Sequence, residues 1–211
     1  MDGVLADSEP VYHEAMQSLL TPLGKERTDQ HQQDMMGSSI EDTWRYLGRT
    51  FEPSGPLGAL IDAYDQELRR QLALVREALP GARELVASLR ARGVPVAVAS
   101  SSLPAWIEAL LGGIGLADAF DAVVSATTVD RGKPAPDIYR EAAARLGVAA
   151  ESCVAIEDTP TGLAAAKAVG MLAVQVRAAS TAWPPLPAAD LVLNSLSEFE
   201  LSLLDAVGGG G

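Results

Sequence analysis

From residue 94 onward, short apolar runs alternate with segments that have the spacing of amphipathic helices. The runs are VPVAVA (94–99), DAVVS (121–125), CVAI (153–156), LAVQV (172–176) and DLVL (190–193). Such runs have apolar residues at most successive positions, rather than at every second residue, which is typical of parallel strands covered on both faces. The alternation of strands and helices therefore predicts an α/β fold built on a parallel sheet.

Residues 11–79 have a different pattern, in which apolar residues recur at helical spacing and no segment is a convincing strand. The first helix begins after Ser8-Glu9-Pro10, and a second is predicted to open at Ser38, which has capping-box spacing to Glu41. A third helical pattern runs over residues 57–79 and ends at Pro80-Gly81. This part of the chain is therefore expected to be helical.

Composition and charge exclude several classes of function. The chain has 211 residues, a net charge of −12 and no basic run, so we expect no nucleic-acid partner and no attraction to an anionic membrane. No apolar stretch is long enough to span a bilayer. A single cysteine and the lack of a cationic and apolar leader lead us to expect a cytoplasmic protein.

Polar residues follow the predicted strands, where ligands bind in sheets of this kind. Read singly, each could be a helix cap or a solvated charge. Read together, a lysine and small hydroxyls facing carboxylates are suited to phosphoryl transfer with Mg²⁺, which prefers oxygen ligands. These residues are Asp2, Ser100, Ser101, Lys133, Glu157 and Asp158.

Four segments, in order and spacing, resemble the motifs of the haloacid dehalogenase-like (HAD) hydrolases. They are DGVLADSEP, VAVASSS, GKPAPDIY and VAIEDTPTGLAAAKAVGM, and the likeness is closest to the branch with phosphoglycolate phosphatase, sugar phosphatases and β-phosphoglucomutase. The resemblance implies a Rossmann-like core formed by residues 1–10 and 80–211. It also implies a mobile helical cap over residues 11–79, a Mg²⁺ cofactor and a small phosphorylated metabolite as substrate.

The resemblance also implies a role for each residue. Asp2 corresponds to the second aspartate of an Asp-x-Asp-Gly motif, the general acid and base, and also contributes to the metal site. Ser100, with Ser101 beside it, and Lys133 are expected to hold the phosphoryl group, and Ser100 and Lys133 to assist catalysis. The metal is expected at Asp2 and at two further acids of the fourth motif, Glu157 and Asp158, of which Asp158 is the better ligand.

The first aspartate of that motif, the nucleophile, falls on the position before Met1. We expect that the start was assigned at the middle of an Asp-Met-Asp-Gly motif, or that the sequence is truncated. In the family the strand that ends in this aspartate lies centrally in the sheet, so a chain without it is expected to contain an apolar slot. A further alternative, which takes the sequence literally, is a catalytically silent protein that binds phosphorylated ligands or partners.

Two further points remain open in the sequence. A β-phosphoglucomutase-like mutase is an alternative to a phosphatase, but Ile40 stands where that enzyme has a phosphate-binding arginine, and isoleucine cannot pair with phosphate. Lys25, Arg27 or Arg45 could substitute for it. The chain is expected to be a monomer or a weak homodimer.

Overall fold

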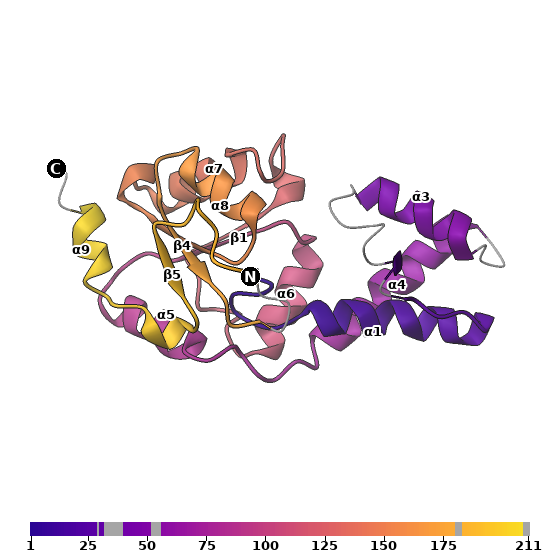
Figure 1. Cartoon of the computed structure of the whole chain (residues 1–211). Helices are drawn as coiled ribbons and strands as arrows, with labels where there is room; N and C mark the ends of the chain where they lie inside the picture. The colour runs from indigo at the N-terminus through magenta and orange to yellow at the C-terminus, as the bar shows by residue number, and fades with distance from the viewer. Residues whose placement is uncertain (29, 32–39, 52–55, 180–182, 209–211) are drawn as a thin grey trace.

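The strands of the computed structural model form two parallel sheets (Figure 1). The structure describes residues 1–28, 30–31, 40–51, 56–179 and 183–208. One sheet pairs β1 with β2 and the other has the order β3-β4-β5, with every strand pair parallel. The predicted α/β fold is therefore confirmed. The strands are β1 (Ala97–Ser100), β2 (Ala122–Ser125), β3 (Val154–Glu157), β4 (Leu172–Val176) and β5 (Leu191–Leu193).

The first strand begins three residues later than the apolar run predicts. Pro95 has no N–H group to give to a ladder. The N–H of Val96 donates instead to the side chain of Asp121, at 2.8 Å. Strand pairing therefore begins only at Ala97, which lies opposite Ala122 in β2.

Helices cover both faces of the sheets. In Figure 1, α7 and α8 lie above the strands and α5 lies below them. The buried residues form two apolar clusters, one that includes α5 and α6 and another that includes α7 and α8. These helices are α5 (Ala82–Ala91), α6 (Pro104–Gly113), α7 (Asp137–Leu146), α8 (Pro160–Lys167) and α9 (Leu203–Gly208).

The predicted helical segment stands to one side of the sheets (Figure 1). It contains α1 (Glu9–Leu20), α3 (Ile40–Phe51) and α4 (Leu57–Leu72), and α4 packs against α1 and α6. The capping residue predicted for the second helix, Ser38, lies outside the described residues. No described helix combines the length and the apolar character that crossing a bilayer requires.

Helix α4 is shorter than its sequence pattern predicts. It ends at Leu72, whereas the pattern continues to Leu79. The N–H of Leu79 donates to the carbonyl of Leu5 at 2.8 Å, and Pro80 disfavours a helical conformation for the residue before it. This bond ties the end of the helical segment to the N-terminal turn, next to the predicted site.

Candidate active site

A polar pocket of about 240 Å³ lies at the carboxyl ends of β1 and β3. Its lining includes every site residue that the sequence predicts, together with Met1, Gly3 and residues of the turn that leads into α1. Parallel strands explain this convergence, because their carboxyl ends meet at one edge of the fold. The predicted residues that line the pocket are Asp2, Ser100, Ser101, Lys133, Glu157 and Asp158.

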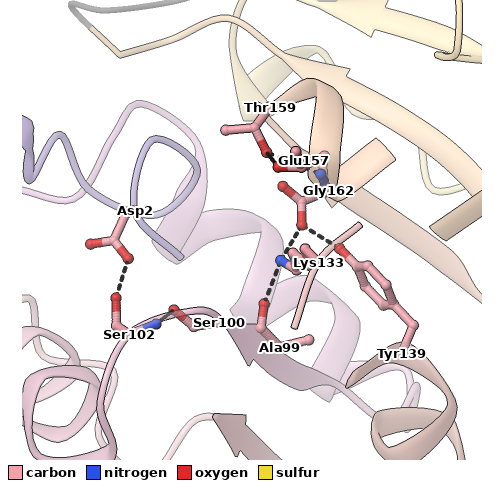
Figure 2. A network of polar contacts seen from close by, with 10 residues as sticks. Asp2, Ala99, Ser100, Ser102, Lys133, Tyr139, Glu157, Thr159 and Gly162 are labelled. Carbon is pink, nitrogen blue, oxygen red and sulfur yellow. Dashed lines mark hydrogen bonds and ion pairs between the residues drawn. The ribbon is translucent and has the colours of Figure 1, made fainter. Parts of the chain in front are cut away.

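Lys133 is held between the two sheets (Figure 2). Its ammonium donates to the carbonyl of Ala99 in β1 at 3.0 Å and forms an ion pair with Glu157 at the end of β3. The hydroxyl of Tyr139, from α7, donates to the same Glu157 oxygen. These contacts fix the position of the lysine, because a buried charge is stable only when it is paired and hydrogen-bonded.

Electrostatic interactions keep the Glu157 carboxylate charged at neutral pH. Burial raises the pKa of Glu157, but the Lys133 ammonium and the hydrogen bonds from Lys133 and Tyr139 outweigh burial and hold the pKa below its ordinary value. Burial and the nearby Glu157 carboxylate raise the pKa of Tyr139 well above its ordinary value, so Tyr139 remains a hydrogen-bond donor. Glu157 is thus the counter-ion of Lys133, and its predicted role as a metal ligand stays a prediction.

The loop that carries Lys133 is fastened by an ion pair. Arg131 binds the carboxylate of Asp137 through two hydrogen bonds of 2.9 Å each, and Asp137 begins α7. The hydrogen bonds from Arg131 lower the pKa of Asp137. The Lys133–Pro134 peptide bond within this loop is cis.

Three hydroxyl groups hold the carboxylate of Asp2. Ser8 donates to Oδ1 at 2.5 Å, Ser102 donates to Oδ2 at 2.9 Å, and Tyr12 donates to Oδ1 at 3.4 Å. The hydroxyls of Tyr12 and Ser102 also lie 3.1 Å apart. Asp2 is therefore oriented by residues from the N-terminal turn, α1 and the loop after β1. Its predicted role as general acid and base stays a prediction.

Asp158 lies directly against Gly3. A methyl group added to Gly3 would overlap the Asp158 carboxyl group, and the φ of Gly3 is +67°, so both space and backbone conformation require glycine. Burial raises the pKa of Asp158 to about 6, although the amino group of Met1 lowers it. A cation bound here would favour the ionised carboxylate.

The serines after β1 have different environments. Ser100 is buried, and its Oγ accepts a hydrogen bond of 3.2 Å from the N–H of Ser102. Ser101 is exposed and lines the pocket. The predicted contacts of both hydroxyls with a phosphoryl group stay predictions.

The sequence does not assign a role to four residues that shape the site: Ser8, Tyr12, Ser102 and Tyr139. Tyr139 is the last residue of the GKPAPDIY motif, and Ser102 is the third of the three consecutive serines, so both stand inside segments that already attract notice. The contact of Tyr12 with Asp2 depends on the turn at residues 3–8, which brings residues ten positions apart together. No sequence period indicates that contact.

The described residues alone supply few ligands for a metal ion. Within the described part of the chain, no group of three or more His, Cys, Asp or Glu side chains is placed to hold a metal. Glu157 is paired with Lys133, and Asp2 accepts bonds from hydroxyls. Asp158 has the oxygen chemistry that Mg²⁺ prefers, but one carboxylate requires further oxygen ligands beside it.

Comparisons with known proteins agree with this geometry. The family model of haloacid dehalogenase-like hydrolases matches residues 1–170. Hexitol phosphatase B of Escherichia coli K12 is 35% identical over 206 residues, which cover 94% of this chain and 90% of that protein. β-Phosphoglucomutase of Bacillus subtilis is 40% identical over 126 residues, which cover 60% of this chain and 53% of that protein.

A solved structure extends the likeness to the whole fold. CbbY from Rhodobacter sphaeroides, in complex with phosphate, has a TM-score of 0.81 and 26% identity, with 97% of this chain and 96% of that chain covered. The Rossmann-like core and helical cap of the family agree with the parallel sheets and the separate helices described above. The chain therefore belongs to the haloacid dehalogenase-like hydrolases.

Proposed function

We propose that this chain is a Mg²⁺-dependent phosphatase that acts on a small phosphorylated metabolite, such as a sugar phosphate. The observation that carries the proposal is the convergence of Lys133, two serines and two separate carboxylates, Asp2 and Asp158, on one pocket. A fixed ammonium stabilises the negative charge that develops on a transferred phosphoryl group. The hexitol phosphatase relative, which aligns over nearly the whole chain, supports this class of substrate.

The reaction requires a carboxylate nucleophile, which we place on the residue joined directly ahead of Met1. Its oxygen attacks phosphorus, the bond between phosphorus and the sugar oxygen breaks, and Asp2 gives its proton to that oxygen. Asp2 then takes a proton from water, and the water oxygen attacks the aspartyl phosphate. Inorganic phosphate leaves and the nucleophile returns to a carboxylate.

We assign a Mg²⁺ site to Asp158, to oxygen atoms of Asp2 and to the nucleophilic carboxylate ahead of Met1. An ion held by these oxygens would supply positive charge beside the phosphoryl oxygens. Glu157 lies next to Asp158 and is predicted to contribute to the same metal site. It also forms the ion pair that fixes the Lys133 ammonium. We assign residues 11–79 to a cap over the pocket. In support of this, the helix that leads into this segment, α1, begins at Glu9, which lines the pocket.

A mutase is the second candidate, and the likeness to β-phosphoglucomutase favours it. Such an enzyme needs a cation for a second phosphate. Lys25, Arg27 and Arg45 are the candidates for that role. Appearance of glucose 6-phosphate from β-glucose 1-phosphate would identify the mutase, whereas release of inorganic phosphate alone identifies the phosphatase.

The test compares two extended forms of the chain, each with an apolar segment ahead of Met1 that ends in Asp or in Asn. We expect the Asp form to hydrolyse p-nitrophenyl phosphate and sugar phosphates when Mg²⁺ is present and to stop when EDTA is added. The Asn form should be slower by about 10⁴-fold or more, because it has no nucleophile. Equal rates for the Asp form, the Asn form and the printed chain would contradict the proposal.

A further inference from the structure

Tyr12 connects the polar pocket with the helical segment. It lies on α1, its hydroxyl donates to Oδ1 of Asp2 at 3.4 Å, and the same hydroxyl lies 3.1 Å from that of Ser102. Ser102 in turn donates to Oδ2 of Asp2 at 2.9 Å. The Tyr12 hydroxyl therefore reaches Asp2 both directly and through Ser102, and the ring behind it determines where that hydroxyl lies.

The ring of Tyr12 packs edge-to-face on the indole of Trp106, with ring centroids 5.9 Å apart and an angle of 72° between the planes. Trp106 belongs to α6, which lies between the strands and the helical segment (Figure 1). The indole also packs edge-to-face on Tyr64 of α4, with centroids 6.2 Å apart. Edge-to-face pairs of aromatic rings are favourable, and they restrict how each ring can turn. One indole of the core thus contacts two helices of the helical segment.

A hydrogen bond to α4 fixes the orientation of this indole. Nε1, the only donor of a tryptophan side chain, donates to Oδ1 of Asp65 at 2.7 Å. The other carboxylate oxygen of Asp65 pairs with Arg69, also of α4, at 3.6 Å. A buried indole N–H usually finds some acceptor, but this acceptor belongs to the helical segment, whereas Trp106 belongs to the core. The bond therefore joins the two parts of the molecule.

Helices α4 and α6 also approach each other closely beyond Trp106. A methyl group added to Gly113 would lie 2.6 Å from the carbonyl oxygen of Val75 and 2.7 Å from that of Leu72. The side chain of Leu72 has no exposed surface. Closely packed helices move as units rather than deform gradually. A displacement of α4 from α6 would therefore break the bond between Asp65 and Trp106.

We infer that Trp106 is a positioning residue, which transmits the placement of α4 to the carboxylate of Asp2 through Tyr12. Asp65 holds the indole, the indole holds the Tyr12 ring, and the Tyr12 hydroxyl holds Ser102 and Asp2. The inference rests on the proposed function only for the role of Asp2 as general acid and base, and the coupling itself requires no substrate. Coupling between two sites is reciprocal. A change at Asp65 must therefore alter the surroundings of Asp2, and a change at the Tyr12 hydroxyl must alter the indole bond.

The first test changes the acceptor of the indole bond in the full chain. Asp65→Leu removes the acceptor, Asp65→Asn keeps an oxygen that can accept, and Asp62→Leu changes an exposed acid of the same helix as the control. The chain is labelled with carbon-13 at the side-chain carboxyl of aspartate, and the NMR signal of Asp2 is identified by its loss in Asp2→Asn. At one fixed pH, we expect this signal to move by more than its linewidth in Asp65→Leu. It should return toward the parent position in Asp65→Asn and stay in place in Asp62→Leu.

The second test begins at the opposite end of the same contacts. Tyr12→Phe keeps the aromatic ring and removes only the hydroxyl. The indole N–H signals are followed in a chain labelled with nitrogen-15 tryptophan, and Trp106→Phe identifies the signal of Trp106. We expect hydrogen exchange at this indole to become about fivefold faster or more in Tyr12→Phe. The indole of Trp183, which is exposed and makes none of these contacts, is the internal control and should exchange at an unchanged rate.

Three results would overturn the inference. They are an Asp2 signal that stays in place in Asp65→Leu, one that moves equally in Asp62→Leu or in Asp65→Asn, and unchanged exchange of the Trp106 indole in Tyr12→Phe. Each would mean that the aromatic contacts pack independently of Asp2. If Asp65→Leu does not fold, Tyr12→Phe decides the question, because it removes a single oxygen atom and leaves the ring contacts in place.

Both tests are carried out without substrate, so their outcome is separate from that of the phosphatase test. Coupling between Asp65 and Asp2 together with no hydrolysis by the Asp form would support the role of Trp106 and refute the phosphatase. Hydrolysis by the Asp form without this coupling would refute the role of Trp106 and leave the phosphatase.

Discussion

The charge state of a side chain in the pocket depends on how deeply that side chain is buried and on which groups it pairs with. Glu157 and Asp158 are neighbours in sequence, yet Glu157 is held ionised by Lys133 whereas burial raises the pKa of Asp158 to about 6. The sequence predicts both acids at the strand end and the preference for Asp158 as a metal ligand. It does not indicate the pairing of Glu157, because that depends on Lys133 and Tyr139 arriving from other elements.

Replacing Glu157 by Gln should destabilise the fold by about 2–4 kcal/mol at pH 7, because a buried ammonium then loses its counter-ion. The folded pKa of Glu157 lies below the ordinary value of 4.5, so its stabilising effect is present above that pH and is lost as the pH falls. Urea unfolding of the parent and of Glu157→Gln at pH 7 and pH 3 measures both effects. Glu141→Gln, at an exposed pair with Arg145, is the control and should change stability by less than about 0.5 kcal/mol. An equal loss in the two variants would contradict the buried pair.

Replacing Asp158 by Asn should stabilise the chain in neutral and alkaline solution. The folded pKa is raised from 3.8 to about 6, so the native state binds the extra proton in that window and stability falls as the pH rises through it. Asp158→Asn lacks this loss and should be more stable than the parent by about 1–3 kcal/mol at pH 8, but equally stable at pH 4. Thermal unfolding across this range tests it, with exposed Asp62→Asn as the control. A parent that is as stable as the variant at pH 8 would refute the raised pKa.

At the scale of elements, the sequence predicts which segments are strands and helices better than where they end. Pro95 and the hydrogen bond from Val96 to Asp121 delay β1, and the residues after α4 bond to Leu5 instead of continuing the helix. Both hydrogen bonds join the segment to a residue outside it. The periodicity of apolar residues in the sequence gives no information about such contacts. Helix α8 is a case where the element and the site constrain each other.

Gly162 of α8 lies against the Glu157 carboxyl group, where a methyl group would overlap it. Alanine is intrinsically better than glycine in a helix by about 1 kcal/mol. Gly162→Ala should nevertheless destabilise the chain by about 1–3 kcal/mol, because the carboxylate must move from Lys133. Gly58→Ala in α4, where the added methyl meets open space, should instead stabilise it by about 0.5–1 kcal/mol. Chemical denaturation compares the pair, and a stabilising Gly162→Ala would be inconsistent with this contact.

At the scale of the whole molecule, the parallel strands bring residues from distant segments to one pocket. Asp2, Ser100, Lys133 and Asp158 converge there, as the motif order predicts. An apolar cavity of about 270 Å³ is lined by residues of β1 and β3. What the sequence could not supply is the Asp2 network of Ser8, Tyr12 and Ser102, since it depends on how α1 leaves the N-terminal turn.

The most direct test of this account is the site of phosphorylation in the Asp-extended chain. The chain is mixed with Mg²⁺ and a sugar phosphate, quenched in acid within one turnover, and analysed by peptide mass spectrometry. The account predicts one phosphoryl group, on the aspartate directly ahead of Met1, and none in the Asn form. Hydrolysis that proceeds with the phosphoryl group on Ser100 or Ser101, or at the same rate in the Asn form, would contradict it.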